Sequence, residues 1–266
     1  MRTPSSFDPD IDRVANLMAD AARQAILPYF RQADLSSDNK LAEGFDPVTE
    51  ADRAGERAMR AVLGRERPDD AILGEEYGHA TGRSGLTWVL DPIDGTRGFI
   101  SGTPTWGVLI AVSDAQGPFY GLIDQPYVGE RFVGHPGAAR SDGPMGPRSL
   151  ATRPCTVLDQ AIVFTTFPEV GSPAEGAAFH AVARQAKLTR YGMDCYAYAL
   201  LAAGQIDLVI EAGLNPYDIQ APIAVIEAAG GIVTDWQGGP AHQGGRVLAA
   251  ANRSLHAAAL ELLAIG

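Results

Sequence analysis

Hydrophobic positions near the N-terminus recur with the spacing of helices. Over residues 10–33 they form a single helical stripe, made of Ile11, Val14, Leu17, Met18, Ala21, Ala25 and Ile26. The polar segment that follows, "RQADLSSDNKLAEGFDP", has no clear periodicity and predicts a loop. A second helix is predicted to begin near Thr49 and to run through "EADRAGERAMRAVLGRE".

Short apolar runs of the β type come next along the chain. They are "AILGEE", "TWVLDP", "WGVLIAVS", "FYGLI" and "RFVG". No long helical pattern separates them, so consecutive strands are expected to pair directly with their neighbours. The first half of the chain is therefore predicted to be α+β with much antiparallel pairing.

Beyond residue 145 the pattern changes to an alternation of strands and helices. The Gly- and Pro-rich stretch "HPGAARSDGPMGPRSL" predicts a seam near that residue, between an N-terminal half (1–145) and a C-terminal half (146–266). The strands predicted after it are "AIVFTT", "IDLVIEA", "GIVTDW" and "RVLAAAN". Helices are predicted near 173–186, through "DCYAYALLAAG", through "YDIQAPIAVIEAAG" and at the end of the chain. This alternation is typical of an α/β fold.

Composition and charge exclude several classes of protein. The chain has 266 residues, of which 46% are hydrophobic, so it can bury a substantial core. The formal net charge of -11 argues against a nucleic-acid partner, since phosphate backbones are bound by clustered Lys and Arg. No apolar run is long enough to span a membrane, and the N-terminus lacks the apolar region of a signal peptide. The two cysteines, Cys155 and Cys195, form no disulfide framework, so a cytoplasmic location is expected.

Acidic residues gather where apolar runs end or helices begin. Asp91 and Asp94 lie in "LDPIDGTRGF", and Glu75 ends the run "AILGEE". Asp52 and Asp218 lie at the starts of two predicted helices. Strand ends and helix starts are the places where α/β folds assemble binding sites.

Each of these residues also has an ordinary structural interpretation. Thr49 and Asp52 are spaced as a capping box, and Asp218 is favoured at a helix N-terminus by the helix dipole. Asp91 and Asp94 surround a proline and precede a glycine, which is typical of a turn. The combination is far harder to explain by chance than any one member.

The motifs "DPVTEAD", "GEE", "LDPIDGTRGF" and "YDIQAPIAVIEAAGG" resemble, in this order, the signature motifs of the inositol monophosphatase superfamily. They run from residue 46 to 231. The resemblance implies a layered α-β-α-β-α sandwich, a homodimer, and a lithium-sensitive phosphatase that binds two or three Mg²⁺ ions per site. One departure is Tyr217, which stands where many members have Trp before the last aspartate.

The resemblance also implies roles for the acidic residues. Glu75 and Asp91 would hold a first metal with the backbone carbonyl of Ile93, and Asp91 would bridge to a second metal held by Asp94 and Asp218. All of these are oxygen donors without Cys or His, which favours magnesium over zinc. Bound cations would also let several carboxylates stay ionised together and let an acidic protein bind an anion.

Two further positions complete the site that the resemblance implies. Asp52 and Thr96 would orient the attacking water. The backbone N–H groups of Gly95 and Thr96 would bind the phosphate, because glycine permits a close approach at the start of a helix. The pair of aspartates around a tight turn then has a purpose, since the turn itself holds the phosphate.

The region from residue 190 to 219 is most similar to the histidinol-phosphatase branch, as is "GTRGFISGTPTWGVLIA". In that alignment Asp194 and Glu211 lie where inositol-binding members contact substrate hydroxyls. An acidic residue at 194 would pair with the ammonium of histidinol phosphate, which a neutral polyol lacks. Arg190 would steer the phosphate or form an ion pair with Asp194. In the alternative interpretation Asp194 only caps the following helix.

Other functions stay open on the sequence alone. An inositol monophosphatase or a broad sugar-phosphate phosphatase is the main alternative. A nucleoside 3',5'-bisphosphate phosphatase fits less well because the sequence offers no additional basic pocket. A catalytically silent, metal-dependent binding protein would not need the water-positioning pair.

Overall fold

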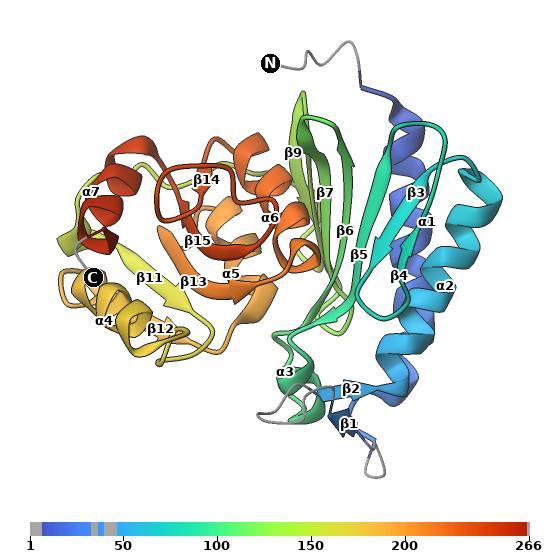
Figure 1. Ribbon diagram of the computed structural model, residues 1–266, viewed down its shortest axis with the longest axis horizontal. Coiled ribbons are helices and arrows are strands. Elements are labelled where there is room, and N and C mark those ends of the chain that lie inside the picture. The colour runs from blue at the N-terminus through green and yellow to red at the C-terminus, as the bar shows by residue number, and fades with distance from the viewer. Residues whose placement is uncertain (1–6, 33–36, 40–46, 265–266) are drawn as a thin grey trace.

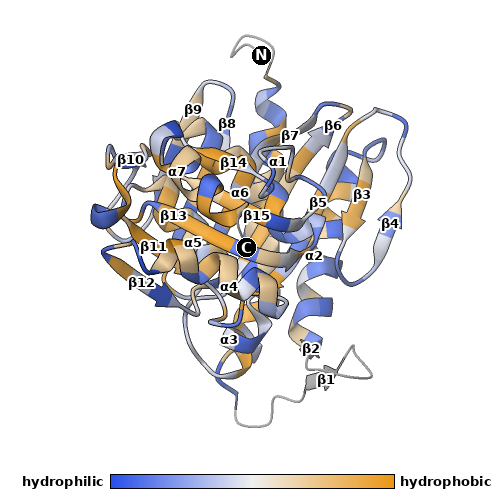
Figure 2. Ribbon diagram, turned by 60° about the vertical axis from the view of Figure 1, so that its left-hand side comes forward, coloured by the Kyte–Doolittle hydropathy of each residue, from blue (hydrophilic) through white to orange (hydrophobic). Residues whose placement is uncertain are grey.

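The computed structural model describes residues 7–32, 37–39 and 47–264, and these form five layers (Figure 1). Two helices cover one face of a large sheet, two helices fill the space between that sheet and a second one, and two helices cover the far side. The predicted α-β-α-β-α sandwich is confirmed. Figure 2 shows that hydrophobic residues follow the strands of both sheets, whereas α2 carries hydrophilic stretches.

The first layer consists of α1 (Pro9–Ile26) and α2 (Glu50–Glu66), which pack against each other. The carboxylate of Asp8 caps α1 by accepting a hydrogen bond from Asp10 N at 3.0 Å. The helical stripe was predicted to continue to residue 33, but α1 ends at Ile26 and a short 3₁₀ turn (Leu27–Tyr29) follows. Pro28 explains the difference, because proline has no N–H to continue the helix.

The second layer is an eight-stranded sheet in the order β10-β9-β8-β7-β6-β5-β3-β4. Its strands are β3 (Ala71–Gly74), β4 (Gly78–Ala80), β5 (Thr87–Asp94), β6 (Gly107–Asp114), β7 (Gly117–Gln125), β8 (Glu130–His135), β9 (Ala138–Asp142) and β10 (Arg148–Ser149). All neighbours are antiparallel except β3 and β5, so the predicted antiparallel pairing is confirmed.

The Gly- and Pro-rich stretch expected to be a connector contains two strands of this sheet, β9 and β10. Residue 145 lies in the turn between them. Short strands rich in Ala, Ser and Arg carry little apolar alternation, which is why the pattern missed them. The division into halves at residue 145 stays a prediction.

The loop predicted for residues 31–47 lies largely outside the described residues. Within it, β1 (Ser37–Asn39) pairs antiparallel with β2 (Pro47–Thr49). The predicted start of α2 near Thr49 is confirmed, because Thr49 is the N-cap of that helix.

The middle layer consists of α5 (Asp194–Ala202) and α6 (Pro216–Ala228), and α6 packs on the first sheet. Glycine makes this approach possible. A Cβ on Gly121 would lie 2.2 Å from the carbonyl oxygen of Ala221, and one on Gly134 would lie 2.4 Å from Val225 Cα. The backbone of α6 therefore lies directly on the sheet, which places its N-terminus beside the end of β5.

The fourth layer is a five-stranded sheet in the order β12-β11-β13-β15-β14. Its strands are β11 (Ile162–Thr165), β12 (Leu188–Tyr191), β13 (Leu208–Leu214), β14 (Ile232–Thr234) and β15 (Gly245–Ala250). The outer helices are α4 (Pro173–Ala183) and α7 (Arg253–Leu263). The sequence missed β12, an edge strand with mostly exposed residues and therefore no apolar pattern.

None of the helices in the described residues combines the length and the apolar character that crossing a bilayer requires.

Candidate active site

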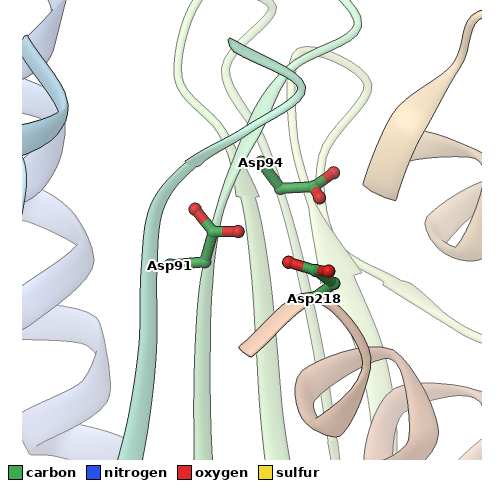
Figure 3. A group of neighbouring side chains, drawn as sticks. All are labelled: Asp91, Asp94 and Asp218. Carbon is green, nitrogen blue, oxygen red and sulfur yellow. The ribbon is translucent and has the colours of Figure 1, made fainter. Parts of the chain in front are cut away.

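Three aspartates converge between the first sheet and the middle layer (Figure 3). Carboxylate oxygens of Asp91, Asp94 and Asp218 all lie within 4.8 Å of one another. Asp91 and Asp94 belong to β5, whereas Asp218 belongs to the first turn of α6. The structure thus brings together three predicted metal ligands that come from segments more than a hundred residues apart.

A bulge in β5 explains how two residues three positions apart face the same side. In a regular strand such residues point to opposite faces of the sheet. Here Asp91 pairs with Leu109 but Asp94 pairs with Gly107, so the strand contains one extra residue. A bulge of this kind redirects side chains. Asp91 Oδ1 also accepts a hydrogen bond from Ile93 N at 3.0 Å, which fixes the turn.

Asp218 combines a structural and a site position. Asn215 N donates a hydrogen bond to Asp218 Oδ2 at 2.6 Å, so the residue completes a capping box at the start of α6. Asp218 therefore does have the structural role expected of an acidic residue at a helix N-terminus. It does not compete with the site, because the same residue also supplies an oxygen to the three-aspartate cluster.

The remaining two predicted ligands line the same cavity. Glu75 follows β3, and its N–H donates a hydrogen bond to Leu90 O at 3.1 Å, which holds it beside β5. Ile93 also lines the cavity. The donors available there are carboxylates and a backbone carbonyl, a set that suits a hard cation such as Mg²⁺.

Burial and mutual repulsion disfavour the ionised forms of two of these carboxylates. Burial raises the pKa of Asp91 well above its ordinary value, and the neighbouring charges of Glu75, Asp94 and Asp218 raise it further. Burial also raises the pKa of Asp94 well above its ordinary value, followed by the charges of Asp194 and Asp218. A cation among these groups would reverse the repulsion, so the residues present fit a metal site.

Asp52 uses its two oxygens differently. Oδ2 accepts hydrogen bonds from Thr49 N at 2.8 Å and Thr49 Oγ1 at 2.6 Å, which confirms the capping box. Oδ1 faces Thr96 Oγ1 at 3.4 Å, and that hydroxyl also lies 3.1 Å from Ile93 O. Burial raises the pKa of Asp52 to about 6, so it can accept a proton near neutral pH.

The turn after β5 depends on Gly95. Its φ of 88° lies in the left-handed region, and it is the N-cap of the short helix α3 (Thr96–Ile100). A Cβ at this position would lie 2.9 Å from the side chain of Asp194. Phe99 anchors the helix by packing against Trp106, with ring centroids 4.9 Å apart. Backbone freedom and close packing therefore both require glycine here.

The three-aspartate cluster opens into a cavity of about 260 Å³. Residues from β5, α3, α5, β13 and α6 line it, so both sheets and the middle layer contribute. Two further predicted site residues, Asp194 and Glu211, lie in its wall. Burial raises the pKa of Asp194 to about 6, although the charge of Arg97 and a hydrogen bond with Thr105 lower it.

Glu211 is 7% exposed and accepts hydrogen bonds from Thr166 N at 3.0 Å and Thr166 Oγ1 at 2.7 Å. Burial nevertheless raises its pKa to about 8. Asp194 has a φ of 45° and is the first residue of α5, whose N-cap is Met193. The interpretation of Asp194 as a helix cap is therefore wrong.

The structure does not bring Arg190 to the cavity. This arginine lies exposed on the edge strand β12. The arginine whose charge acts on Asp194 is Arg97, which lines the cavity on α3. The predicted ion pair between Arg190 and Asp194 is therefore replaced by an interaction of Asp194 with Arg97, which is much farther away along the chain.

Sequence reasoning also missed three residues at the cavity. Phe167 is 43% exposed, and the guanidinium of Arg97 lies 4.7 Å from its ring centroid. Tyr198 lines the inner wall on α5. Thr166 holds Glu211. Only a contact between α5 and the aspartates could have singled out Tyr198, because in the helical pattern it is indistinguishable from core.

Comparison with known proteins agrees with this geometry. The family model of the inositol monophosphatase family matches residues 9–265. The chain belongs to the inositol monophosphatase family. It is 43% identical over 242 residues to the chloroplastic bifunctional phosphatase IMPL2 of Arabidopsis thaliana, a match that covers 89% of this chain and 68% of the relative.

A histidinol-phosphatase of Streptomyces coelicolor is 33% identical, with 92% of this chain and 93% of the relative covered. Among solved structures, an inositol monophosphatase from Zymomonas mobilis superposes with a TM-score of 0.85 at 40% identity, covering 97% of this chain and 99% of that one. The protein is thus a phosphatase of this family. The names of its relatives include both histidinol-phosphatase and inositol-1-monophosphatase.

Proposed function

We propose that the protein is a magnesium-dependent phosphomonoester hydrolase that converts histidinol phosphate to histidinol and phosphate in histidine biosynthesis. The observation that carries the proposal is the position of Asp194 and Glu211. Glu211 is buried and Asp194 is half-buried, and both line the cavity that contains the three-aspartate cluster. The three-aspartate cluster suits metal ions, whereas the separate pair of Asp194 and Glu211 suits an alcohol that carries a positive charge.

The metal ligands of this proposal are five groups around the bulge in β5. Glu75, Asp91 and the carbonyl of Ile93 would hold one Mg²⁺, and Asp91 would share a second with Asp94 and Asp218. Bound Mg²⁺ would acidify the attacking water and neutralise charge on the phosphate oxygens. The raised pKa values of Asp91 and Asp94 support this set, because they result from burial and from the neighbouring carboxylates, which a bound cation would offset.

Asp52 and Thr96 would hold the attacking water. Thr96 Oγ1 lies within hydrogen-bond reach of Ile93 O and faces Asp52 Oδ1 at 3.4 Å. The water would give a proton to the threonine hydroxyl as that hydroxyl passes its own proton to Asp52. The raised pKa of Asp52 supports the last step, because an ordinary aspartate is a much weaker base.

Gly95 and Thr96 would bind the phosphate through backbone N–H groups at the start of α3. The left-handed conformation of Gly95 turns the chain sharply after β5. Consecutive N–H groups in such a turn form a concave site for an anion. The ester oxygen would then lie between this turn and the wall formed by Asp194 and Glu211.

The substrate preference follows from charge. A primary ammonium beside Asp194 and Glu211 would add a positive charge to a wall in which the charge of Arg97 already acts on Asp194, whereas a neutral polyol would add none. Phe167 at the cavity gives an exposed aromatic ring for the imidazole. The histidinol-phosphatase from Streptomyces coelicolor supports the same substrate at 33% identity.

Inositol 1-phosphate is the second candidate substrate. The inositol monophosphatase from Zymomonas mobilis supports it with 40% identity over nearly the whole chain. Carboxylates such as Glu211 also bind hydroxyl groups well. A broad sugar-phosphate phosphatase would use the same contacts. The homodimer and the cytoplasmic location expected from the sequence stay predictions.

The first testable prediction concerns Asp194→Asn. Asparagine tolerates the left-handed backbone of this position, so the fold should be retained. We expect kcat/KM for histidinol phosphate to fall about ten- to a hundred-fold, the value of a charge-assisted hydrogen bond. The loss should appear mainly in KM, because the ammonium lies away from the breaking P–O bond. Phosphate release with Mg²⁺ measures it, with glycerol phosphate as the neutral ester.

Asp69→Asn is the matched control. Asp69 forms an exposed ion pair with Arg83 and does not line the cavity, so its loss should leave the kinetics unchanged. A wild-type protein that prefers inositol 1-phosphate, or an Asp194→Asn protein that loses all esters equally, would contradict the histidinol proposal. No phosphate release from any ester with Mg²⁺ would favour a catalytically silent binding protein.

A further inference from the structure

The hydroxyl of Tyr198 is buried without a hydrogen-bond partner among the described residues. The side chain lies on α5, is 3% exposed, and lines the cavity. In two other tyrosines, one in the first sheet and one in the middle layer, the hydroxyl has a hydrogen-bond partner. Tyr120 Oη donates to Asp12 Oδ1 at 2.9 Å, and Tyr196 Oη donates to Glu130. A buried polar atom without a partner is uncommon in folded proteins, so this one requires an explanation.

The groups around this hydroxyl are carboxylates of the cavity. Burial raises the pKa of Tyr198 well above its ordinary value, and the charges of Glu211, Asp94 and Asp218 raise it further. Ionised carboxylates only accept hydrogen bonds, whereas a phenol both donates and accepts. The described residues include no hydrogen-bond partner for this hydroxyl, so its donor and acceptor capacity are both unused. A ligand that enters the cavity can supply a partner.

We propose that Tyr198 Oη contacts the alcohol part of the phosphate ester and accepts a hydrogen bond from an N–H or O–H group next to the ester carbon. This inference rests on the proposed phosphatase function and deepens it. The substrate class is phosphate esters of 2-amino or 2-hydroxy alcohols. The phosphate itself is assigned to the turn at Gly95 and Thr96, so the alcohol part is the portion of the ester left to contact this hydroxyl.

Tyr198 is a specificity residue in this scheme. Histidinol phosphate carries an ammonium on the carbon next to its ester carbon, and inositol 1-phosphate carries a hydroxyl at the same relative position. Both esters therefore offer the required donor. A phosphate ester of an alcohol without any N–H or O–H group offers none.

Tyr198→Phe tests the inference because it removes only the hydroxyl and keeps the ring. Tyr196→Phe is the matched control. Tyr196 lies on the same helix two residues earlier, but its hydroxyl bonds to Glu130 and it does not line the cavity. Each variant is assayed with Mg²⁺ on histidinol phosphate, inositol 1-phosphate and 4-nitrophenyl phosphate, and its thermal midpoint is measured.

For Tyr198→Phe we expect kcat/KM to fall about ten-fold on the wild type's preferred donor-bearing ester, mainly through KM, with no change on 4-nitrophenyl phosphate. The thermal midpoint should stay the same or rise, because the variant removes a buried polar atom that has no partner. Tyr196→Phe should lower the midpoint, since it loses a hydrogen bond, and should leave all kinetics unchanged.

Two outcomes would overturn the inference. One is an equal loss on all three esters, which would indicate a general disturbance of the cavity. The other is no loss on any ester, which would indicate that a water molecule satisfies the hydroxyl. A wild type that prefers inositol 1-phosphate, together with a selective loss in Tyr198→Phe, removes the histidinol proposal but supports this inference.

Discussion

Two aspartates at this site, Asp52 and Asp218, each combine a helix-capping contact with a contact inside the site. Asp52 gives one oxygen to the cap of α2 and turns the other toward Thr96. Asp218 closes the capping box of α6 and joins the three-aspartate cluster. A capping residue is held rigidly by backbone N–H groups, so the fold itself fixes the orientation that chemistry requires. Structural and functional interpretations of these residues are complementary.

Glu211 gives the second prediction, which concerns pH. Its pKa is about 8 in the folded protein, against an ordinary value of 4.5. The folded protein therefore keeps a proton that the unfolded chain has lost, and the free energy of unfolding should fall as pH rises from about 5 to about 8. One group contributes a slope of at most about 1.4 kcal/mol per pH unit. In metal-free protein, Glu211→Gln should make the slope of the free energy of unfolding against pH less steep, by at most this amount.

Urea unfolding of the metal-free protein across this pH range measures the slope. Glu175→Gln is the control, because hydrogen bonds with Ser172 and Arg246 lower the pKa of Glu175 to about 2. Its stabilising contribution is present above pH 4.5 and is lost only as pH falls toward 2. The control should therefore leave the slope between pH 5 and pH 8 unchanged. A Glu211→Gln slope equal to that of wild type would contradict the prediction.

At the scale of elements, the turn between β5 and α3 decides whether the site forms. Gly95→Ala should cost about 1–2 kcal/mol for the left-handed backbone and should push Asp194 away, since the new Cβ would lie 2.9 Å from it. We expect phosphatase activity to be lost while the protein remains folded. Phosphate release and thermal unfolding measure the two effects separately.

Gly85→Ala is a close control for this third prediction. Gly85 has a similar φ of 85°, but a Cβ there would meet no atom within 4 Å. The control should show the same backbone cost with full activity. Equal activity in both variants would mean that the close packing of Gly95 and Asp194 is unimportant.

The elements explain what could be predicted from the sequence. Residues that end a strand or begin a helix, such as Asp91 and Asp218, were found because their position along the chain predicts their position in the fold. The bulge in β5 could not be predicted, because it depends on pairing with β6. Tyr198 looked like one more core residue of α5. Arg97 was overlooked because its partner, Asp194, lies almost a hundred residues later in the chain.

At the scale of the molecule, the cavity joins layers that the chain builds separately. Asp91 and Asp94 come from the first sheet, Asp218 from the middle layer, and Glu211 from the second sheet. A bound metal would therefore link the first sheet to α6, in addition to packing and hydrogen bonds such as that between Cys195 N and Asp94 Oδ2. Ligands that bind the folded protein alone raise its stability by mass action. The homodimer that the resemblance implies would add an interface outside this link and stays a prediction.

Asp91→Asn provides the last prediction, because Asp91 lies at the centre of this link. In metal-free protein it removes one of the three carboxylates that lie within 4.8 Å, so repulsion falls and the thermal midpoint should rise. Each kcal/mol gained corresponds to about 2–4 °C in a protein of this size. The increase in the midpoint that Mg²⁺ gives to the wild type should disappear, together with activity.

Asp124→Asn separates this effect from the loss of any buried aspartate. Asp124 is also fully buried, but Arg23 and Arg131 neutralise it at 2.7 and 2.8 Å. Its replacement should lower the thermal midpoint, because Arg23 and Arg131 lose a buried charge partner, yet it should keep the response to Mg²⁺. Thermal unfolding with Mg²⁺ or with a chelator distinguishes the two variants. An Asp91→Asn protein that releases phosphate at nearly the wild-type rate would mean that Asp91 does not bridge two metals.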